Sequence, residues 1–418
     1  MKELARPVSK HLLNIEDKNR SSLFPWRGQF SPQLVECILE AYCPPASVVL
    51  DPFVGSGTVL LEAARIGLPA FGFDINPSAW SFSKIYEFAN ILPRHREHAI
   101  AELNRKIVDE FPIVIFSDPE LEYGELEERI IRVGTSLSDE AKILCSALVV
   151  MLDLHNNTIT ADFVRAKLRA LTNLVHKLPY SSGPIKVHLQ DARSLSLENQ
   201  SVDFVITSPP YINVFNYHQN YRRSVELLGW NILRVARSEL GSNRANRGNR
   251  FLTVIQYCID MAATLQELAR VLKPGGSAIV IAGHESRVLG VPFYNADIIR
   301  RIAVESGSFE FVLRQERQFK NRYGKSIRED ILNLALKNTG RNEESFKSLG
   351  PRVARDALND SAKVVERKNQ SLLIQALDKA QNIEGTPVFD GSTYEEYQTR
   401  DAVIAVREQG CTTTYESK

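Results

Sequence analysis

A proline-rich stretch in the second half of the chain has residue types that could act on an amino group. Residues 207–211, Thr-Ser-Pro-Pro-Tyr, follow the apolar run 202–206, so they stand where a strand ends. Two prolines fix φ and remove two N–H donors, which leaves carbonyl oxygens that accept hydrogen bonds. The lone pair of a base's exocyclic amino group is delocalised into the ring, and acceptors that draw on its N–H bonds make the nitrogen more nucleophilic. We expect the Ser208 hydroxyl and the Pro209 carbonyl to be those acceptors, and Tyr211 to offer a stacking face.

A glycine-bearing turn earlier in the chain is typical of a nucleotide pocket. Asp51 ends an apolar run, and Gly55 and Gly57 then let the backbone approach a ligand where a helical pattern begins. Asp74 ends the next apolar run, about 20 residues beyond the glycines, where a carboxylate holds ribose hydroxyls in doubly wound folds. Asp191 follows a third such run and is placed to accept a hydrogen bond from an adenine amino group. The alternatives are a plain turn for the glycines and a helix N-cap for Asp191.

Alternating strand and helix patterns must position these residues. Each apolar run ends in a polar or proline-rich loop, and the run 278–282 shows no alternation, as expected for a strand buried on both faces. The pattern predicts an α/β fold with a mostly parallel sheet. The predicted strands cover residues 47–50, 70–73, 185–189, 202–206, 278–282, 309–312 and 331–336.

The chain divides into four predicted parts. Residues 1–92 form the N-terminal segment and the first half of the catalytic domain, and 93–180 form an inserted helical subdomain. Residues 181–338 complete the catalytic domain and include a basic loop at 212–250. Residues 339–418 form a polar, helix-like extension without a recognisable site.

The stretches 51–58 (Asp-Pro-Phe-Val-Gly-Ser-Gly-Thr) and 207–211 together resemble the amino-methyltransferases of DNA modification, which make N4-methylcytosine or N6-methyladenine. Residues 30–39 resemble the segment of that family that packs on the methionine end of the cofactor, with Ser31 where many members have lysine. The resemblance implies a Rossmann-like methyltransferase fold with a seven-stranded sheet and an antiparallel last strand. It also implies S-adenosyl-L-methionine as the cofactor. The implied catalytic residues are Ser208, Pro209, Pro210 and Tyr211, and the implied cofactor-binding residues are Asp51, Phe53, Gly55, Gly57, Asp74 and Asp191.

The resemblance further implies a substrate. A serine before the two prolines favours N4 of cytosine in this family, and aspartate favours N6 of adenine, so cytosine is the preferred target. Such an enzyme flips its base out of double-stranded DNA. A restriction-modification system, with a cognate restriction endonuclease as partner, is the expected context. The long insertion between the second and third strands matches no known recognition domain that we can assign.

Basic residues follow the catalytic stretch closely. Seven arginines stand against two glutamates between Arg222 and Arg250, and a second basic run extends from Arg314 to Arg328. Contact with DNA phosphates is a natural use of such runs, and solvated surface is the alternative. We therefore expect DNA to lie near these runs.

Two other functions fit parts of the pattern. Guanine-N2 methyltransferases of RNA share a similar glycine turn and an Asn- or Asp-Pro-Pro loop. The other alternative is a non-catalytic nucleic-acid-binding subunit in which the cofactor pocket has only a structural role. Methylation at cytosine C5 is disfavoured, because it needs a cysteine nucleophile after proline and residues 207–211 contain none.

Bulk composition narrows the class of protein. The 418 residues are 44% hydrophobic and 24% charged, as in a globular protein. The formal net charge of +1 neither supports nor excludes a nucleic-acid partner. No apolar stretch approaches the roughly 20 residues that span a bilayer, so we expect a cytoplasmic protein without membrane contact. The five scattered cysteines lack metal-ligand spacing, so we expect reduced thiols and no metal.

Overall fold

The structure is a computed structural model of the chain. It describes residues 4–26, 28–113, 117–212, 216–242, 246–321, 324–337 and 343–390. The predicted basic residues Arg244 and Arg322, the aromatic Tyr323 and most of the last part of the chain lie outside these ranges.

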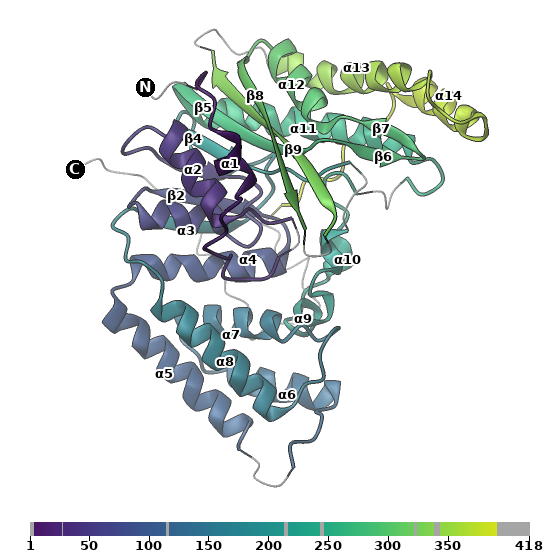
Figure 1. Cartoon of the computed structure of the whole chain (residues 1–418). Coiled ribbons are helices and arrows are strands. Elements are labelled where there is room, and N and C mark those ends of the chain that lie inside the picture. The colour runs from purple at the N-terminus through teal and green to yellow at the C-terminus, as the bar shows by residue number, and fades with distance from the viewer. Residues whose placement is uncertain are drawn as a thin grey trace.

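Seven strands form one sheet in the order β3-β2-β1-β4-β5-β9-β8. β1 to β5 run parallel to their neighbours, β9 is antiparallel to both β5 and β8, and the sheet twists through the middle of the molecule (Figure 1). This is the predicted mostly parallel sheet with an antiparallel last strand, so the Rossmann-like fold is confirmed. The strands are β1 Val49–Asp51, β2 Ala70–Asp74, β3 Ile185–Leu189, β4 Val202–Thr207, β5 Leu272–Gly283, β8 Phe309–Lys320 and β9 Ser326–Leu336.

All seven predicted strands are present, and β8 and β9 are longer than the apolar runs that predicted them. Their outer ends form a hairpin of alternating charged residues, with Glu316 paired to Asp330 and Arg317 paired to Glu329 in register. Residues 314–318 are all polar, although Gln315 and Arg317 among them are buried, so hydrophobicity alone could not reveal these ends. A separate two-stranded ribbon pairs β6 Ser286–Val288 with β7 Val291–Phe293.

Helices cover both faces of the sheet, because successive strand side chains point to opposite sides. Val49, Phe204 and Ile279 belong to the hydrophobic cluster under one set of helices, and Leu50 and Val205 belong to the cluster under the other. The first set comprises α2 Pro32–Tyr42, α3 Thr58–Arg65, α4 Pro77–Ser83 and the 3-10 helix η1 Lys84–Asn90. The second comprises α11 Phe251–Val271, α12 Asn295–Glu305, α13 Glu343–Ser361 and α14 Gln370–Lys379.

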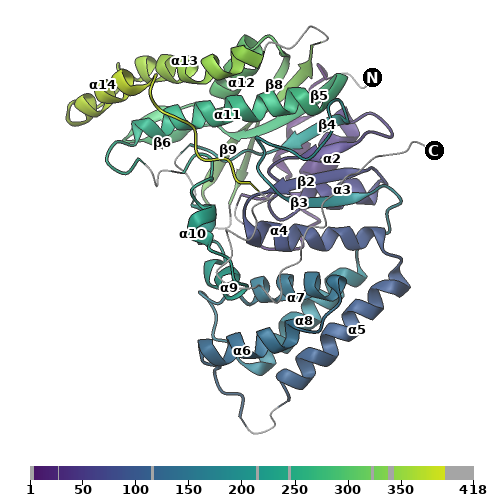
Figure 2. The ribbon, with the colours of Figure 1, turned by 180° about the vertical axis from the view of Figure 1, so that it is seen from behind.

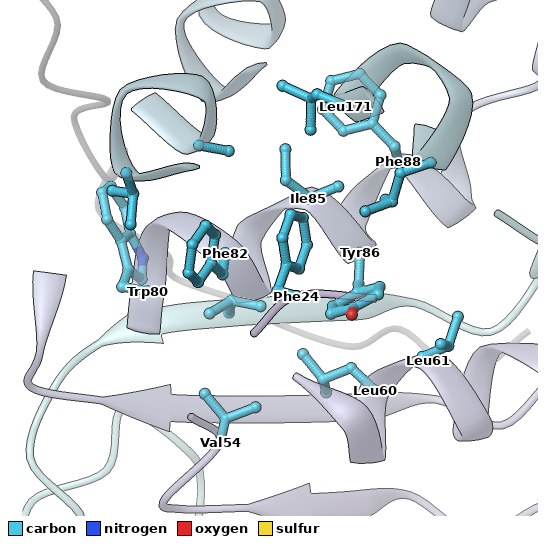
Figure 3. Close-up of a cluster of buried hydrophobic side chains, with 14 of the residues drawn as sticks. Phe24, Val54, Leu60, Leu61, Trp80, Phe82, Ile85, Tyr86, Phe88 and Leu171 are labelled. Atoms are coloured by element: carbon cyan, nitrogen blue, oxygen red, sulfur yellow. The ribbon is translucent and has the colours of Figure 1, made fainter. Parts of the chain in front are cut away.

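Four helices between η1 and β3 extend the molecule on the side of α4, as Figures 1 and 2 show. α7 packs on α4, and Leu171 of α8 shares a buried cluster with Ile85 and Phe88 of η1 (Figure 3). In the same cluster, Phe24 stacks on Phe82 with ring centroids 4.5 Å apart. The helical group is thus continuous with the core beneath the sheet. It comprises α5 Pro93–Glu110, α6 Tyr123–Gly134, α7 Asp139–Leu152 and α8 Ala161–His176.

Short elements complete the fold. α1 Lys10–Asn14 packs on β8, and the 3-10 helix η3 Arg367–Asn369 leads into α14. The 3-10 helix η2 Tyr217–Gln219, α9 Arg222–Leu227 and α10 Ile232–Val235 lie between β4 and α11. After α14 the chain runs back across α11 (Figure 2). Residues 384–390, which we call the C-terminal strap, end this path beside Asp191.

Candidate functional site

One pocket lies where four strands end side by side. Asp51 closes β1, Asp74 closes β2, Ser208 follows β4 directly, and Asp191 lies two residues after the end of β3. All four residues line a single cavity with an empty volume of about 840 Å³, the part open to solvent included. Ligands bind at this carboxyl edge in open α/β sheets. The structure thus brings together residues separated by up to 157 positions in the chain.

The glycine turn between β1 and α3 approaches the pocket closely at Gly55. Gly55 has a φ of +50°, and a Cβ there would lie 3.2 Å from the indole nitrogen of Trp26. Gly57 has another reason to be glycine, because a Cβ there would lie 2.4 Å from the Tyr86 ring. Gly57 is not among the described residues that line the pocket, so its predicted cofactor contact has no support in the geometry.

Asp51 is a buried carboxylate and Asp74 a partly buried one, and each has few internal partners. Asp51 accepts hydrogen bonds from the Thr207 hydroxyl at 2.7 Å and the Phe53 backbone N–H at 3.1 Å. Asp74 accepts them from the backbone N–H groups of Gly55 at 3.1 Å and Asn76 at 2.8 Å. Burial raises the pKa of each carboxyl to about 7. Each is therefore poised to be ionised by a ligand that brings hydrogen-bond donors or positive charge.

Asp191 lines the pocket, but its carboxylate is already occupied. Both oxygens accept bonds from the Arg193 guanidinium, at 2.9 and 2.7 Å, and one also accepts from the Arg193 backbone N–H at 3.0 Å. The other accepts from the backbone N–H of Phe389 at 3.0 Å. Four donors fill the acceptor capacity of a carboxylate. Asp191 therefore anchors Arg193 and the C-terminal strap, and its contact with an adenine stays a prediction.

The Ser-Pro-Pro-Tyr loop follows β4 beside Asp51. Ser208 and Pro210 line the pocket, while Pro209 is buried behind it. The Tyr211 ring lies against Gly283 of β5, where an added Cβ would come within 2.7 Å of the ring. The Tyr211 hydroxyl lies 3.4 Å from the Ser208 hydroxyl and donates to Glu329 at 3.3 Å. Its position is thus fixed by the sheet on one side and by Glu329 of β9 on the other.

Two loops that the motifs do not include cover the same pocket. Trp26, Gln29 and Phe30 line it from the N-terminal segment, and Tyr217 and Glu239 line it from the region after the Ser-Pro-Pro-Tyr loop. The loops touch each other, because Trp26 stacks on Tyr221 with ring centroids 6.2 Å apart. The signal that could have found Trp26 is an aromatic side chain four residues before Phe30, where the segment that resembles the family begins.

The two basic runs differ in how many of their charges are paired internally. In the first run Arg223, Arg237, Arg247 and Arg250 are exposed on the surface. In the second, Arg314 binds Asp297 and Asp330, Arg317 binds Glu329, and Arg328 binds Glu316. The second run is therefore mostly an ion-paired hairpin, and the first carries the more available charge for phosphates.

One group of described residues could geometrically hold a metal ion, namely His284, Glu316 and Asp330. Asp330 already binds Arg314 and His284, and Glu316 binds Arg328. None of the three lines the pocket. The absence of a metal therefore stays an expectation from the sequence. Among the helices of the described ranges, none is long and apolar enough to cross a membrane.

Comparisons with known proteins match the first part of the chain. Residues 6–84 match the family model for DNA methylases of the N6 and N4 type. A curated relative, the Type II methyltransferase M.MjaII of Methanocaldococcus jannaschii, is 38% identical over 60 residues, which are 14% of this chain and 11% of the relative. The chain thus spans about a tenth of the relative that it matches. These matches confirm the resemblance to DNA amino-methyltransferases and support S-adenosylmethionine as the cofactor.

Solved structures share only a weak overall likeness. A methyltransferase of Methanosarcina mazei described as SAM-dependent is 13% identical with a TM-score of 0.34, and covers 72% of this chain and 96% of its own. The rRNA methyltransferase aviRa of Streptomyces viridochromogenes is 14% identical with a TM-score of 0.35, and covers 82% of this chain and 100% of its own.

Proposed function

We propose that this chain, whose residues 6–84 belong to the DNA methylase family, transfers a methyl group from S-adenosylmethionine to an exocyclic amino group of a DNA base. The observation that carries the proposal is the placement of Ser208 and Asp51 in one pocket, at the ends of the adjacent strands β4 and β1. The Thr207 hydroxyl joins the two strand ends by donating to Asp51 at 2.7 Å. A group bound at Asp51 therefore lies next to the acceptors that an amino group needs.

The pocket suits S-adenosylmethionine by its charge. Four of its lining residues are acidic, and none of the described lining residues is lysine or arginine. S-adenosylmethionine, when bound, supplies an electrophilic methyl group on a positively charged sulfur. Asp74 would hold the ribose, and Asp51, Phe53 and the backbone at Gly55 would line the remainder. A positively charged ligand also offsets the cost of keeping Asp51 and Asp74 ionised in a buried site.

The catalytic loop can activate an amino group without a strong base. The Ser208 hydroxyl oxygen and the Pro209 carbonyl would accept hydrogen bonds from the two N–H groups of the target amino group. The nitrogen lone pair would then point away from these acceptors. The proton can leave once the nitrogen has become positively charged. Tyr211 would offer its ring to the base, because Gly283 and Glu329 hold that ring in place.

The preferred target is N4 of a cytosine that has been flipped out of double-stranded DNA, with N6 of adenine as the second choice. The serine at the first position of the loop supports cytosine. A site-specific enzyme of this kind acts in a restriction-modification system, and a cognate restriction endonuclease would then be its partner.

Methyl transfer with labelled cofactor tests the activity. Purified protein is incubated with labelled S-adenosylmethionine and either duplex DNA or transfer RNA, and digested nucleosides are separated by mass spectrometry. We expect label in N4-methylcytosine from DNA. Label in N6-methyladenine would change the base only, and label in RNA N2-methylguanosine alone would overturn the proposal.

A variant of Ser208 separates catalysis from passive binding. Ser208→Ala removes one acceptor from the amino group, and we expect kcat to fall about tenfold to a hundredfold with cofactor affinity retained. Ser196→Ala is a matched control, because Ser196 lies outside the pocket. A non-catalytic subunit would instead show no methyl transfer in the unsubstituted protein and no effect of the variant on DNA binding.

A further inference from the structure

A buried pair of ionisable side chains borders the pocket outside the family motifs. His218 of η2 and Glu239, which lies between α10 and α11, are 21 residues apart. His218 Nδ1 lies 2.7 Å from Glu239 Oε2, and their side chains are only 3% and 6% exposed. Neither residue belongs to the sequence stretches that predict the catalytic loop or the glycine turn.

The second oxygen of Glu239 has no hydrogen-bond partner in the part of the chain that the structure describes. Glu239 lines the pocket, and its Oε1 is buried and accepts no hydrogen bond from the described residues. An unsatisfied buried carboxylate oxygen is costly, and such an atom in a native protein calls for an explanation. A hydrogen-bond donor on a bound ligand would satisfy it.

The neighbours of Glu239 indicate which part of a ligand it meets. The charge of Glu239 adds to burial in raising the pKa of Asp74, and it also raises the pKa of Tyr217. Glu239 and Asp74 thus face the same region of the pocket. Asp74 already accepts backbone N–H bonds on both of its oxygens, and Glu239 adds an unused carboxylate oxygen to the same part of the pocket.

We propose that Glu239 Oε1 accepts a hydrogen bond from a ribose hydroxyl of the bound cofactor, and that His218 is a positioning residue that holds Glu239 toward it. The inference rests on the proposed cofactor. It places a second carboxylate beside Asp74 on the ribose, supplied by the segment between α10 and α11.

Titration calorimetry with two forms of S-adenosylhomocysteine tests the contact. One form has the natural ribose, and the other is its 2′,3′-dideoxy analogue. Glu239→Gln keeps the size of the side chain but weakens the acceptor. We expect it to weaken binding of the natural form about tenfold or more, and that of the dideoxy analogue less than about twofold.

The variant His218→Ala tests the positioning role, and His218→Asn tests its rescue. We expect His218→Ala to reduce the preference for the natural ribose as Glu239→Gln does. Asparagine can place an N–H near the position of Nδ1, so His218→Asn should restore most of that preference. A residue that merely filled space would not change the ratio of the two affinities.

Controls separate this inference from folding defects and from the proposed function. Glu226→Gln removes a half-exposed glutamate of α9 that binds Arg222, and it should leave both affinities unchanged. Melting without ligand checks each fold, and Glu239→Ala replaces Glu239→Gln if that variant is unstable. Equal losses for both forms of the ligand, or no loss, would overturn the role of Glu239 even if the protein methylates DNA. Selective loss without methyl transfer would leave the contact standing and refute the proposed activity.

Discussion

Two aspartates of the pocket have raised pKa values. Asp51 is fully buried and Asp74 partly buried, and their partners are a hydroxyl and backbone N–H groups rather than cations. Burial therefore raises both pKa values to about 7 from an ordinary value of 3.8. Between pH 3.8 and about pH 7 the folded protein keeps protons on these carboxyls that the unfolded chain releases. The contribution of the two groups to the free energy of unfolding therefore falls as pH rises through that range.

Ligand binding should have the opposite pH dependence. A cofactor that prefers the ionised carboxylates binds more tightly as pH rises from 6 to 8, by up to about tenfold per pH unit for each carboxyl that loses its proton on binding. Calorimetry of S-adenosylmethionine in buffers of different ionisation enthalpy would detect the released protons. Asp51→Asn should remove part of the slope. A slope unchanged in Asp51→Asn and in Asp74→Asn would show that neither aspartate titrates with binding.

At the scale of elements, the catalytic loop depends on a neighbouring strand. Gly283 of β5 lets the Tyr211 ring lie against the backbone, and Glu329 of β9 accepts a hydrogen bond from the Tyr211 hydroxyl. The loop is thus held by the two strands that follow β4 in the sheet, where β5 and β9 pair Gly283 with Glu329 in register.

Gly283→Ala tests this dependence. Its methyl group would lie 2.7 Å from the Tyr211 ring, so the ring must move. We expect kcat for methyl transfer to fall tenfold or more, by analogy with the cost of misplacing a catalytic group by about 1 Å, while cofactor affinity changes little. Gly124→Ala on α6 is the control, because nothing lies within 4 Å of its added Cβ. Equal kcat values in the two variants would contradict a role of Gly283 in placing the ring.

Local patterns in the sequence predict the strands and the residues that follow them. Asp51, Asp74 and Ser208 each come directly after an apolar run, and parallel strands bring such positions to one edge. Local patterns could not predict Glu239, because a loop places it at the pocket through contacts far along the chain. They also could not show that Gly57 packs on Tyr86, or that Arg317 is paired with Glu329.

Arg193 connects three distant parts of the molecule, namely the pocket edge after β3, α11 and the C-terminal strap. This buried guanidinium binds Asp191 and Asp260, each at 2.7 Å, and also donates to the carbonyl of Thr386 at 2.8 Å. The C-terminal strap is thereby joined to the pocket edge after β3 and to α11. Asp191 shares this network, which links the pocket to the last described part of the chain.

Arg193→Ala should be strongly destabilising. It leaves two buried carboxylates without their cation, a change that costs about 3–5 kcal/mol. Urea unfolding measures the loss, and Arg132→Ala is the control. Arg132 is 53% exposed and pairs with Glu110, so its loss should cost about 0–1 kcal/mol. A loss of less than about 1 kcal/mol in Arg193→Ala would show that the network does not hold the fold together.

The exposed arginines of the first basic run should set the salt dependence of DNA binding. Replacing Arg237 or Arg247 with alanine should reduce the slope of log K against log salt by about 0.9 for each lost phosphate contact. Arg328→Ala is the control, because Arg328 is bound to Glu316. Fluorescence anisotropy at several salt concentrations gives the slopes. The same reduction in all three variants would mean that the two runs contribute alike.

The C-terminal strap has a consequence for the nascent chain. Arg193 and Thr386 are 193 residues apart, and at ~5–20 residues per second a ribosome needs ~10–40 s to pass from one to the other. During that interval Arg193 lacks its contact with Thr386, although the glycine turn has already been synthesised and the Ser-Pro-Pro-Tyr loop follows soon after Arg193. A chain interrupted before Thr386 would therefore contain the glycine turn and the Ser-Pro-Pro-Tyr loop, but Arg193 and Asp191 would lack their contacts with the C-terminal strap.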